Sequence, residues 1–287
     1  MVVEKAFAKI NLFLDVSAKR DDGFHDIKSV MQSVSLYDEI RIDGKLADKT
    51  EIEVRNIGAQ LPTDRSNLVY RAAETYFDAA KLNARVDIKL EKAIPIAAGL
   101  AGGSSDAAAT LRGLNRLFGA FDAEKLSDLA ATLGSDVPFC LAGGTAICRG
   151  RGELIQNIKT VDAFAVIAIG DDRISTPQAY AELDRIYSNF DGSVATGADL
   201  YFDSLMRSMD SGMLPNELYN IFETDIAKRA ESVLKIKAEF VSCGSYASLM
   251  SGSGPSVFGL FSDEEAADNA ARHLTDIGYG AYSVKFC

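Results

Sequence analysis

The chain has 287 residues, of which 47% are hydrophobic and 25% are charged, and its net charge at pH 7 is −11. This composition supports one large folded core or two packed domains. It lacks the basic field typical of nucleic-acid-binding proteins, so we expect no nucleic-acid partner. The longest apolar runs, such as residues 164–169, are far too short to span a bilayer, so we expect no membrane insertion.

The cysteines and histidines argue against a structural metal site. The four cysteines are dispersed and lack the paired spacing of metal ligands. Because no signal peptide is visible, we expect them to be reduced thiols in a bacterial cytoplasm. Only two histidines occur, His25 and His273, which excludes a histidine-rich metal site.

Periodicity and turn residues predict a mixed order of elements along the chain. In chain order we expect strands at 5–14 and 30–42, a helix at 67–80, a strand at 86–91, a helix from about 104 to 118, a helix at 123–133, extended chain at 146–158, a buried strand at 164–169, mainly helix from 176 to 236, strands within 238–261, a helix near 267–274 and a strand at 281–286. This order is typical of an α+β fold with two lobes. A shift in composition after Gly170 favours two domains, 1–160 and 161–287.

A glycine-rich loop lies between the strand at 86–91 and the following helix. Its glycines allow tight turns and close approach to a ligand, and the first amides of the helix lack partners within the helix. We expect Ser104 to be the N-cap and Asp106 to lie in the first turn. Such loops bind anions, most often phosphate, although a turn that packs a helix close to a sheet is the alternative. The loop comprises Pro95, Ile96, Ala97, Ala98, Gly99, Leu100, Ala101, Gly102, Gly103, Ser104 and Ser105.

Two charged residues are candidates for catalysis. Lys9 shares a strand face with Asn11, between apolar neighbours, and its ammonium is suited to a phosphate or a reacting hydroxyl. The alternative is an edge-strand lysine that prevents aggregation, and this segment alone favours it. Asp136 follows a helix in a short loop bounded by Gly and Pro, where it is suited to act as a general base on an alcohol. A turn-forming aspartate is the alternative, which this segment alone also favours.

Three further segments carry candidate binding residues. Residues 251–256 form a second turn of Gly and Ser, which fits either a phosphate site or a plain β-turn. Phe24 is suited to stacking on a planar base and His25 to bonding its edge, unless they belong to a surface turn with one buried ring. Tyr180 follows a helix start at Thr176–Pro177, where ordinary packing is the alternative.

Taken together and in this order, these segments resemble the GHMP kinase superfamily. Residues 8–11 are similar to its first motif, residues 95–105 to its second and residues 251–255 to its third. Within the superfamily, residues 19–25, 134–139 and 176–180 resemble the branch that phosphorylates a cytidine diphosphate alcohol of the non-mevalonate isoprenoid route. The resemblance spans essentially the whole chain.

The resemblance implies a fold and a set of roles. The fold would have a first lobe like ribosomal protein S5 and a ferredoxin-like second lobe. The loop at 95–105 would cradle the phosphates of ATP, which acts with Mg²⁺ whose ligands the sequence does not identify. Asp136 would take the proton of the substrate hydroxyl, and Lys9 would orient that hydroxyl and offset developing charge. The cytidine substrate would be held by Phe24, His25, Tyr180 and Asn11, with the two aromatic rings stacked on the cytosine and the histidine bonding its edge.

The chain departs from the family pattern at three places. Ala101 replaces a glycine and is tolerable if its φ is negative, Phe24 replaces a tyrosine, and residues 220–223 read Asn-Ile-Phe-Glu instead of Asn-Asp-Leu-Glu.

Two other functions are alternatives to this kinase activity. A mevalonate or homoserine kinase of the same superfamily is one alternative, although such a kinase has no base to stack on. An inactive binding protein is the other, although it would be expected to lack Lys9 or Asp136.

Overall fold

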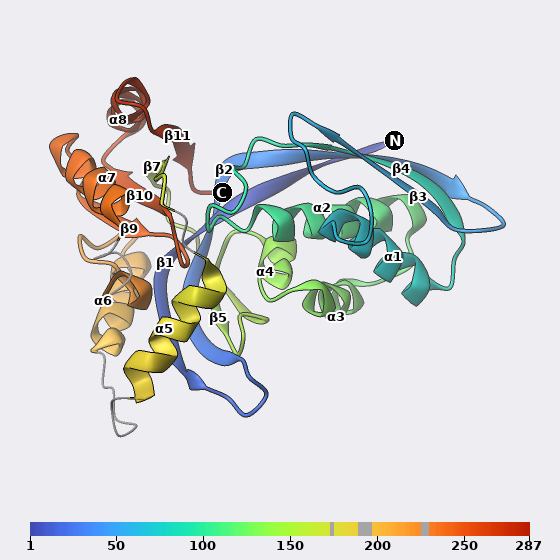
Figure 1. Cartoon of the computed structure of the whole chain (residues 1–287), viewed down its shortest axis with the longest axis horizontal. Coiled ribbons are helices and arrows are strands. Elements are labelled where there is room, and N and C mark those ends of the chain that lie inside the picture. Colours follow the sequence, from blue (N-terminus) through green and yellow to red (C-terminus); the bar gives the residue numbers. More distant parts are fainter. Residues whose placement is uncertain (173–174, 189–196, 225–229) are drawn as a thin grey trace. The chain divides into compact units, whose positions relative to one another are not determined.

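The structure is a computed structural model that describes residues 1–172, 175–188, 197–224 and 230–287 (Figure 1). Within these residues, the strands form one seven-stranded sheet and one four-stranded sheet. Helices lie between and after the strands, which confirms the α+β prediction. No described helix is both long and apolar enough to cross a membrane, and all four cysteines are free thiols.

The chain forms two compact units, each assembled from several segments. The first unit comprises Met1–Ala8, Leu36–Ala97 and Ala101–Gly143, and the second comprises Lys9–Ser35, Ala98–Leu100 and Gly144–Cys287. Strands β1 (Val2–Lys19) and β2 (His25–Leu46) therefore contribute to both. The domain boundary expected at residue 160 stays a prediction.

In the first unit, a layer of strands is accompanied by four helices. The second half of β2 pairs antiparallel with β4 (Ala84–Glu91), which pairs parallel with β3 (Glu51–Ile57). Val86, Ile88 and Leu90 alternate with outward residues along β4 and are buried, as the sequence pattern predicts. The helices are α1 (Leu68–Ala80), α2 (Gly102–Phe118), α3 (Ala123–Leu133) and α4 (Val137–Ala142).

In the second unit, the first half of β2 pairs with β5 (Thr145–Arg149), which pairs with β6 (Leu154–Ile158). The short strand β8 (Tyr219–Asn220) pairs parallel with β1 through Phe13 and Leu14. The separate antiparallel sheet has the order β11 (Gly280–Lys285), β7 (Phe164–Ile169), β10 (Ser256–Phe261) and β9 (Ala247–Met250). The described helices of this unit are α5 (Thr176–Ser188), α6 (Ala198–Asp210), η1 (Ile221–Thr224), α7 (Glu231–Ser242) and α8 (Glu264–Asp276).

Most predicted elements are found, with one clear error in the second half. Residues 238–242, expected to begin a stretch of strands, complete helix α7. The buried side chains Val233, Ile236 and Phe240 follow a helical spacing that runs through this segment. The apolar face of the helix thus outweighs the strand-like composition after residue 238.

Candidate active site

The loop between β4 and α2 has the backbone of an anion site. The φ angles of Ala97, Gly99 and Ala101 are +57°, +75° and +56°, and those of Ala98 and Leu100 between them are negative. Left-handed residues that alternate with residues of negative φ allow successive N–H groups to face one side, an arrangement that favours an anion. The loop then runs directly into the N-terminus of α2, whose dipole favours an anion as well.

Three expectations about this loop are wrong in detail. Helix α2 begins at Gly102, so Ala101 is the N-cap, Ser104 lies inside the first turn and Asp106 lies beyond it. Ala101 has no side-chain acceptor, so the first amides of α2 keep their hydrogen-bonding capacity for a ligand. The φ of Ala101 is +56°, so tolerance through a negative φ does not apply, and the alanine carries a left-handed strain of about 1–2 kcal/mol.

The second glycine-serine turn lies against this loop. A Cβ added to Gly99 would lie 2.6 Å from the Ser251 carbonyl oxygen, so only glycine allows this approach. The Ser251 hydroxyl donates to the Gly99 carbonyl over 3.2 Å, and the Ser253 and Thr176 hydroxyls lie 2.9 Å apart. The second and third motifs, 152 residues apart at this contact, are therefore neighbours in the fold.

Lys9 lies at the same place and is buried, with 5% of its surface exposed. Its ammonium donates to Asn11 Oδ1 at 2.7 Å and to the Gly99 carbonyl at 3.4 Å. Asn11 is fixed in turn by its amide, which donates to the Ser29 hydroxyl at 2.9 Å. The Lys9 N–H donates to the Leu100 carbonyl at 3.1 Å and the side chain is buried, so the alternative of an exposed edge-strand lysine is wrong. The ammonium is instead held beside the backbone of the anion-binding loop.

Sequence reasoning missed the side chain that anchors the second glycine-serine turn. Asn220 is buried, and its amide donates to the carbonyls of Met250 and Gly252 at 2.7 and 2.8 Å. Glu223 accepts the Met250 N–H at 2.6 Å and pairs with Lys237 at 2.6 Å. The departure of residues 220–223 from the family pattern drew attention to residue 221, whereas the outer residues of that segment hold the turn.

Asp136 is the N-cap residue of α4, in the first unit. Its side chain makes no capping hydrogen bond to that helix, and its role as a general base stays a prediction. Lys9 belongs to the second unit.

The residues expected to bind a base gather in the second unit. His25 is buried and its Nε2 lies 2.7 Å from a carboxylate oxygen of Asp184. This partner favours the tautomer protonated at Nε2, which leaves Nδ1 as an acceptor. The ring centroids of His25 and Tyr180 are 4.9 Å apart. Phe24 is 50% exposed, with the Arg151 guanidinium 4.9 Å from its ring centroid.

This arrangement bears on the alternatives for both aromatic residues. The ring of Phe24 is exposed and available for stacking. Of Phe24 and His25, the buried residue is His25. Tyr180 also packs against Phe222, with centroids 5.1 Å apart, so part of its ring serves ordinary packing. A hollow of about 440 Å³ opens beside the preceding turn and is lined by Lys19, Arg20, Asp21 and Asp22. The sequence did not single out Asp184 or Arg151.

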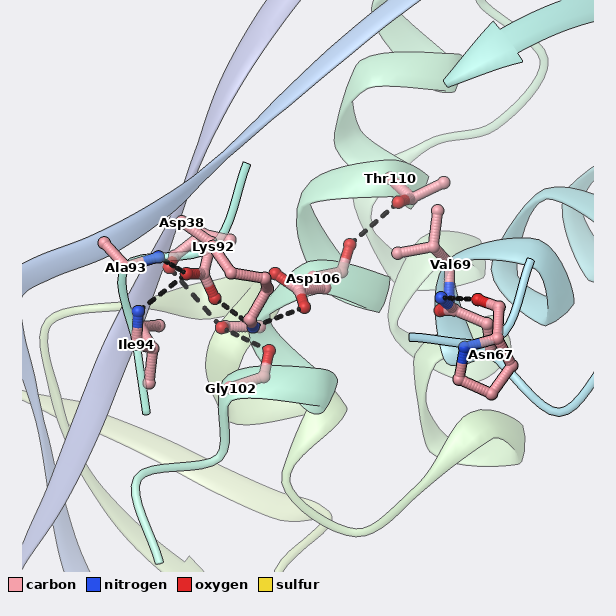
Figure 2. Close-up of polar contacts among 12 residues, drawn as sticks. Asp38, Asn67, Val69, Lys92, Ala93, Ile94, Gly102, Asp106 and Thr110 are labelled. Carbon is pink, nitrogen blue, oxygen red and sulfur yellow. Dashed lines mark hydrogen bonds and ion pairs between the residues drawn. The ribbon is translucent and has the colours of Figure 1, made fainter. Parts of the chain in front are cut away.

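Three buried charged side chains flank the anion-binding loop in the first unit (Figure 2). The Lys92 ammonium lies between the carboxylates of Asp38 and Asp106. Burial disfavours the charged form of Asp106 and raises its pKa to about 7, although the Lys92 ammonium opposes the shift. The second carboxylate oxygen of Asp106 has no hydrogen-bond partner. Neither Asp38 nor Lys92 was expected at the site, because nothing local distinguishes them from solvated charges.

The chain is similar to known proteins over nearly its whole length. Residues 67–144 match the model of the GHMP kinases N terminal domain, and residues 202–280 match that of the GHMP kinases C terminal domain. A 4-diphosphocytidyl-2-C-methyl-D-erythritol kinase of Clostridium beijerinckii is 40% identical over 267 residues, which cover 90% of each chain.

Solved structures agree with this similarity. A crystal structure of a 4-(cytidine 5'-diphospho)-2C-methyl-D-erythritol kinase matches with a TM-score of 0.82 and 32% identity and covers 99% of each chain. The mevalonate kinase of L. major matches with a TM-score of 0.74 but only 12% identity, covering 100% of this chain and 96% of that one, and so shows the fold alone. The chain therefore belongs to the GHMP kinase family, in the branch of the 4-diphosphocytidyl-2-C-methyl-D-erythritol kinases.

Proposed function

We propose that this chain transfers the γ-phosphoryl group of ATP to the 2-hydroxyl of 4-diphosphocytidyl-2-C-methyl-D-erythritol, in the non-mevalonate isoprenoid route. The observation that carries the proposal is the buried Lys9 ammonium, held beside the Gly99 carbonyl of an anion-binding loop. The curated relatives that align over nearly the whole chain bear the name of this activity. A cytoplasmic location in a bacterium remains our prediction.

The residues supply positioning and charge, which is most of what phosphoryl transfer requires. The N–H groups of residues 95–105 bind the phosphates of ATP. Asp136 accepts the proton of the substrate hydroxyl while the hydroxyl oxygen attacks the γ-phosphorus of ATP. The bond between the γ-phosphorus and the ADP oxygen breaks, and ADP leaves. Lys9 offsets the negative charge that develops on the attacking oxygen and on the transferred group.

Mg²⁺ is the ion we propose to accompany ATP. The preformed anion cradle fits the nucleotide phosphates, and Mg²⁺ in such sites is held by those phosphates and one or two carboxylates. In the part of the chain that the structure describes, no group of three or more His, Cys, Asp or Glu side chains could hold a metal ion. We therefore assign no protein ligand to it.

The cytidine end of the substrate fits the second unit. Phe24 offers an exposed ring and Tyr180 a second ring beside His25. We propose that these two rings stack on the cytosine and that His25 Nδ1 accepts from its amino group, while Asn11 positions the alcohol. A mevalonate or homoserine kinase would have no use for this aromatic pair. An inactive binding protein would have no use for Lys9 and Asp136 together.

The test compares the wild-type protein with Asp136→Asn. With saturating ATP and substrate, we expect the kcat of the variant to fall by roughly 10²- to 10⁴-fold, with the KM for ATP within about threefold. Asp128→Asn, at a 67% exposed side chain on α3, is the matched control and should keep full activity. Near-normal turnover by Asp136→Asn would reject Asp136 as the base. Faster ATP consumption with mevalonate or homoserine than with the cytidine substrate would reject the substrate.

A further inference from the structure

Lys92, the first residue after β4, forms a buried bridge between two elements of the first unit. Its ammonium pairs with Asp38 of β2 and donates to Asp106 of α2 at 2.8 Å. The exposed fractions of the three side chains are 6%, 0% and 4%. Figure 2 shows the ammonium lying between the two carboxylates.

Each carboxylate is tied to one end of the anion-binding loop. Asp38 Oδ1 accepts the N–H groups of Ala93 and Ile94, at 2.6 and 2.8 Å, and these residues immediately precede the loop. Asp106 lies in α2 directly after the loop. The backbone also approaches the bridge there, since a Cβ added to Gly102 would lie 3.3 Å from the Lys92 ammonium. The bridge therefore fixes both the entry and the exit of the loop.

Stability alone gives little reason for such a bridge. Buried ion pairs are often no better for stability than apolar side chains of similar volume, because the charges lose their hydration. Here two carboxylates share one ammonium, and one oxygen of Asp106 has no partner. What the bridge does provide is fixed geometry, because its hydrogen bonds join a strand, the start of the loop and a helix.

We propose that Lys92 is a positioning residue for nucleotide binding: by holding Asp38 and Asp106 together, it sets the spacing of the two ends of the loop and the direction of the loop N–H groups. The inference rests on the proposed function, in which the loop binds the phosphates of ATP. Lys92 acts through the loop and needs no contact with the nucleotide.

Three substitutions test the bridge without relying on one that unfolds the protein. Asp106→Leu removes the link to α2 and leaves a neutral Lys92–Asp38 pair, so no charge is stranded. Asp106→Asn keeps an oxygen that accepts from the ammonium and should rescue the effect. Lys92→Met removes the bridge itself, and Lys89→Met, at an exposed position of β4, is its matched control.

The measurement is the affinity for ADP and for adenosine, together with the KM for ATP and kcat. We expect Asp106→Leu and Lys92→Met to weaken ADP binding and raise the KM for ATP roughly tenfold, because small misplacements of binding groups have effects of at least this size. Adenosine affinity should change less than about twofold, and kcat should change less than KM. Asp106→Asn and Lys89→Met should resemble the wild type. The double variant that combines Asp106→Leu and Lys92→Met should bind ADP no more weakly than the weaker-binding single variant, because both substitutions remove the same bridge.

The outcomes separate this inference from the proposed function. Equal losses for adenosine and ADP would overturn it, because they would indicate a direct contact with the nucleoside or a general loss of structure. Unchanged ADP affinity in Asp106→Leu would overturn it as well. A wild-type protein that binds no ADP would reject the proposed function instead.

Discussion

Replacing Asp106 by asparagine tests whether this buried carboxyl group keeps its proton near neutral pH. Burial raises its pKa to about 7, from the value of 3.8 expected for an exposed aspartate. The geometry favours Asp106 over Asp38 as the protonated carboxyl group, because Asp38 accepts from Lys92 and from two backbone N–H groups. Asp106 accepts from Lys92 alone, through one oxygen.

The sign of the effect on stability follows from the number of protons bound in each state. Between pH 4 and pH 7 the folded protein keeps the Asp106 proton and the unfolded chain has lost it, so the free energy of unfolding falls as pH rises. The loss begins above the pKa of the unfolded aspartate and is complete above the folded pKa. For a folded pKa of about 7, the change from pH 6 to pH 8 is about 1.4 kcal/mol. Asparagine carries no proton to lose, so Asp106→Asn removes this contribution.

The assay is urea unfolding of both proteins at pH 6, 7 and 8. Far-UV circular dichroism is the appropriate signal, since the chain contains no tryptophan. We expect the unfolding free energy of Asp106→Asn to rise by about 1.4 kcal/mol relative to the wild type between pH 6 and pH 8. The exposed control Asp128→Asn should show no such change. A constant difference between Asp106→Asn and wild type would refute the reasoning, because it would mean that Lys92 keeps Asp106 ionised in the folded protein throughout this pH range.

Two further predictions concern the backbone of the site. Ala101→Gly removes the left-handed backbone strain of the alanine, about 1–2 kcal/mol, but adds the chain entropy of glycine to the unfolded state, about 0.5–1 kcal/mol. Thermal unfolding should therefore show a free energy of unfolding higher by up to about 1 kcal/mol, with an unchanged KM for ATP. A clear loss of stability would contradict the strain at Ala101. Asn220→Ala leaves the carbonyls of Met250 and Gly252 without their buried donor, so it should cost about 2–3 kcal/mol in urea unfolding. The same variant should lower kcat, because the turn it releases packs against Gly99 and Lys9; wild-type kcat in a destabilised variant would show that the turn does not position the lysine.

Local signals in the sequence predicted much of the fold. Helix α3 begins and ends as periodicity indicates, and Asp122 caps it by accepting the Lys125 N–H. Asn67 caps α1 in the same way. These features depend on residues within one or two turns of each other, so the sequence around them is sufficient. The glycine-rich loop was found for the same reason, because its glycines are adjacent.

Features that depend on distant residues could not be predicted in this way. The position of Lys9 depends on the Gly99 carbonyl, 90 positions along the chain, to which its ammonium donates. Asp38 and Lys92 are 54 residues apart. Asp38 looks like an ordinary charge within a strand, and Lys92 looks like one just after a strand. Only the folded chain shows that they meet. Ala101 is a third case, since the sign of its φ is set by the path between β4 and α2 and not by its side chain.

The buried charges also explain how an acidic chain can hold an anion-binding loop. The net charge of −11 does not attract nucleotides, so the affinity must arise locally, from N–H groups and a few buried cations. The bridge beside the loop carries one negative charge if Asp106 is ionised and none if Asp106 holds its proton. A neutral bridge allows Lys92 to fix both ends of the loop without placing a net negative charge beside the phosphates. The same burial that raises the pKa of Asp106 therefore makes a carboxylate-rich bridge compatible with the binding of an anion next to it.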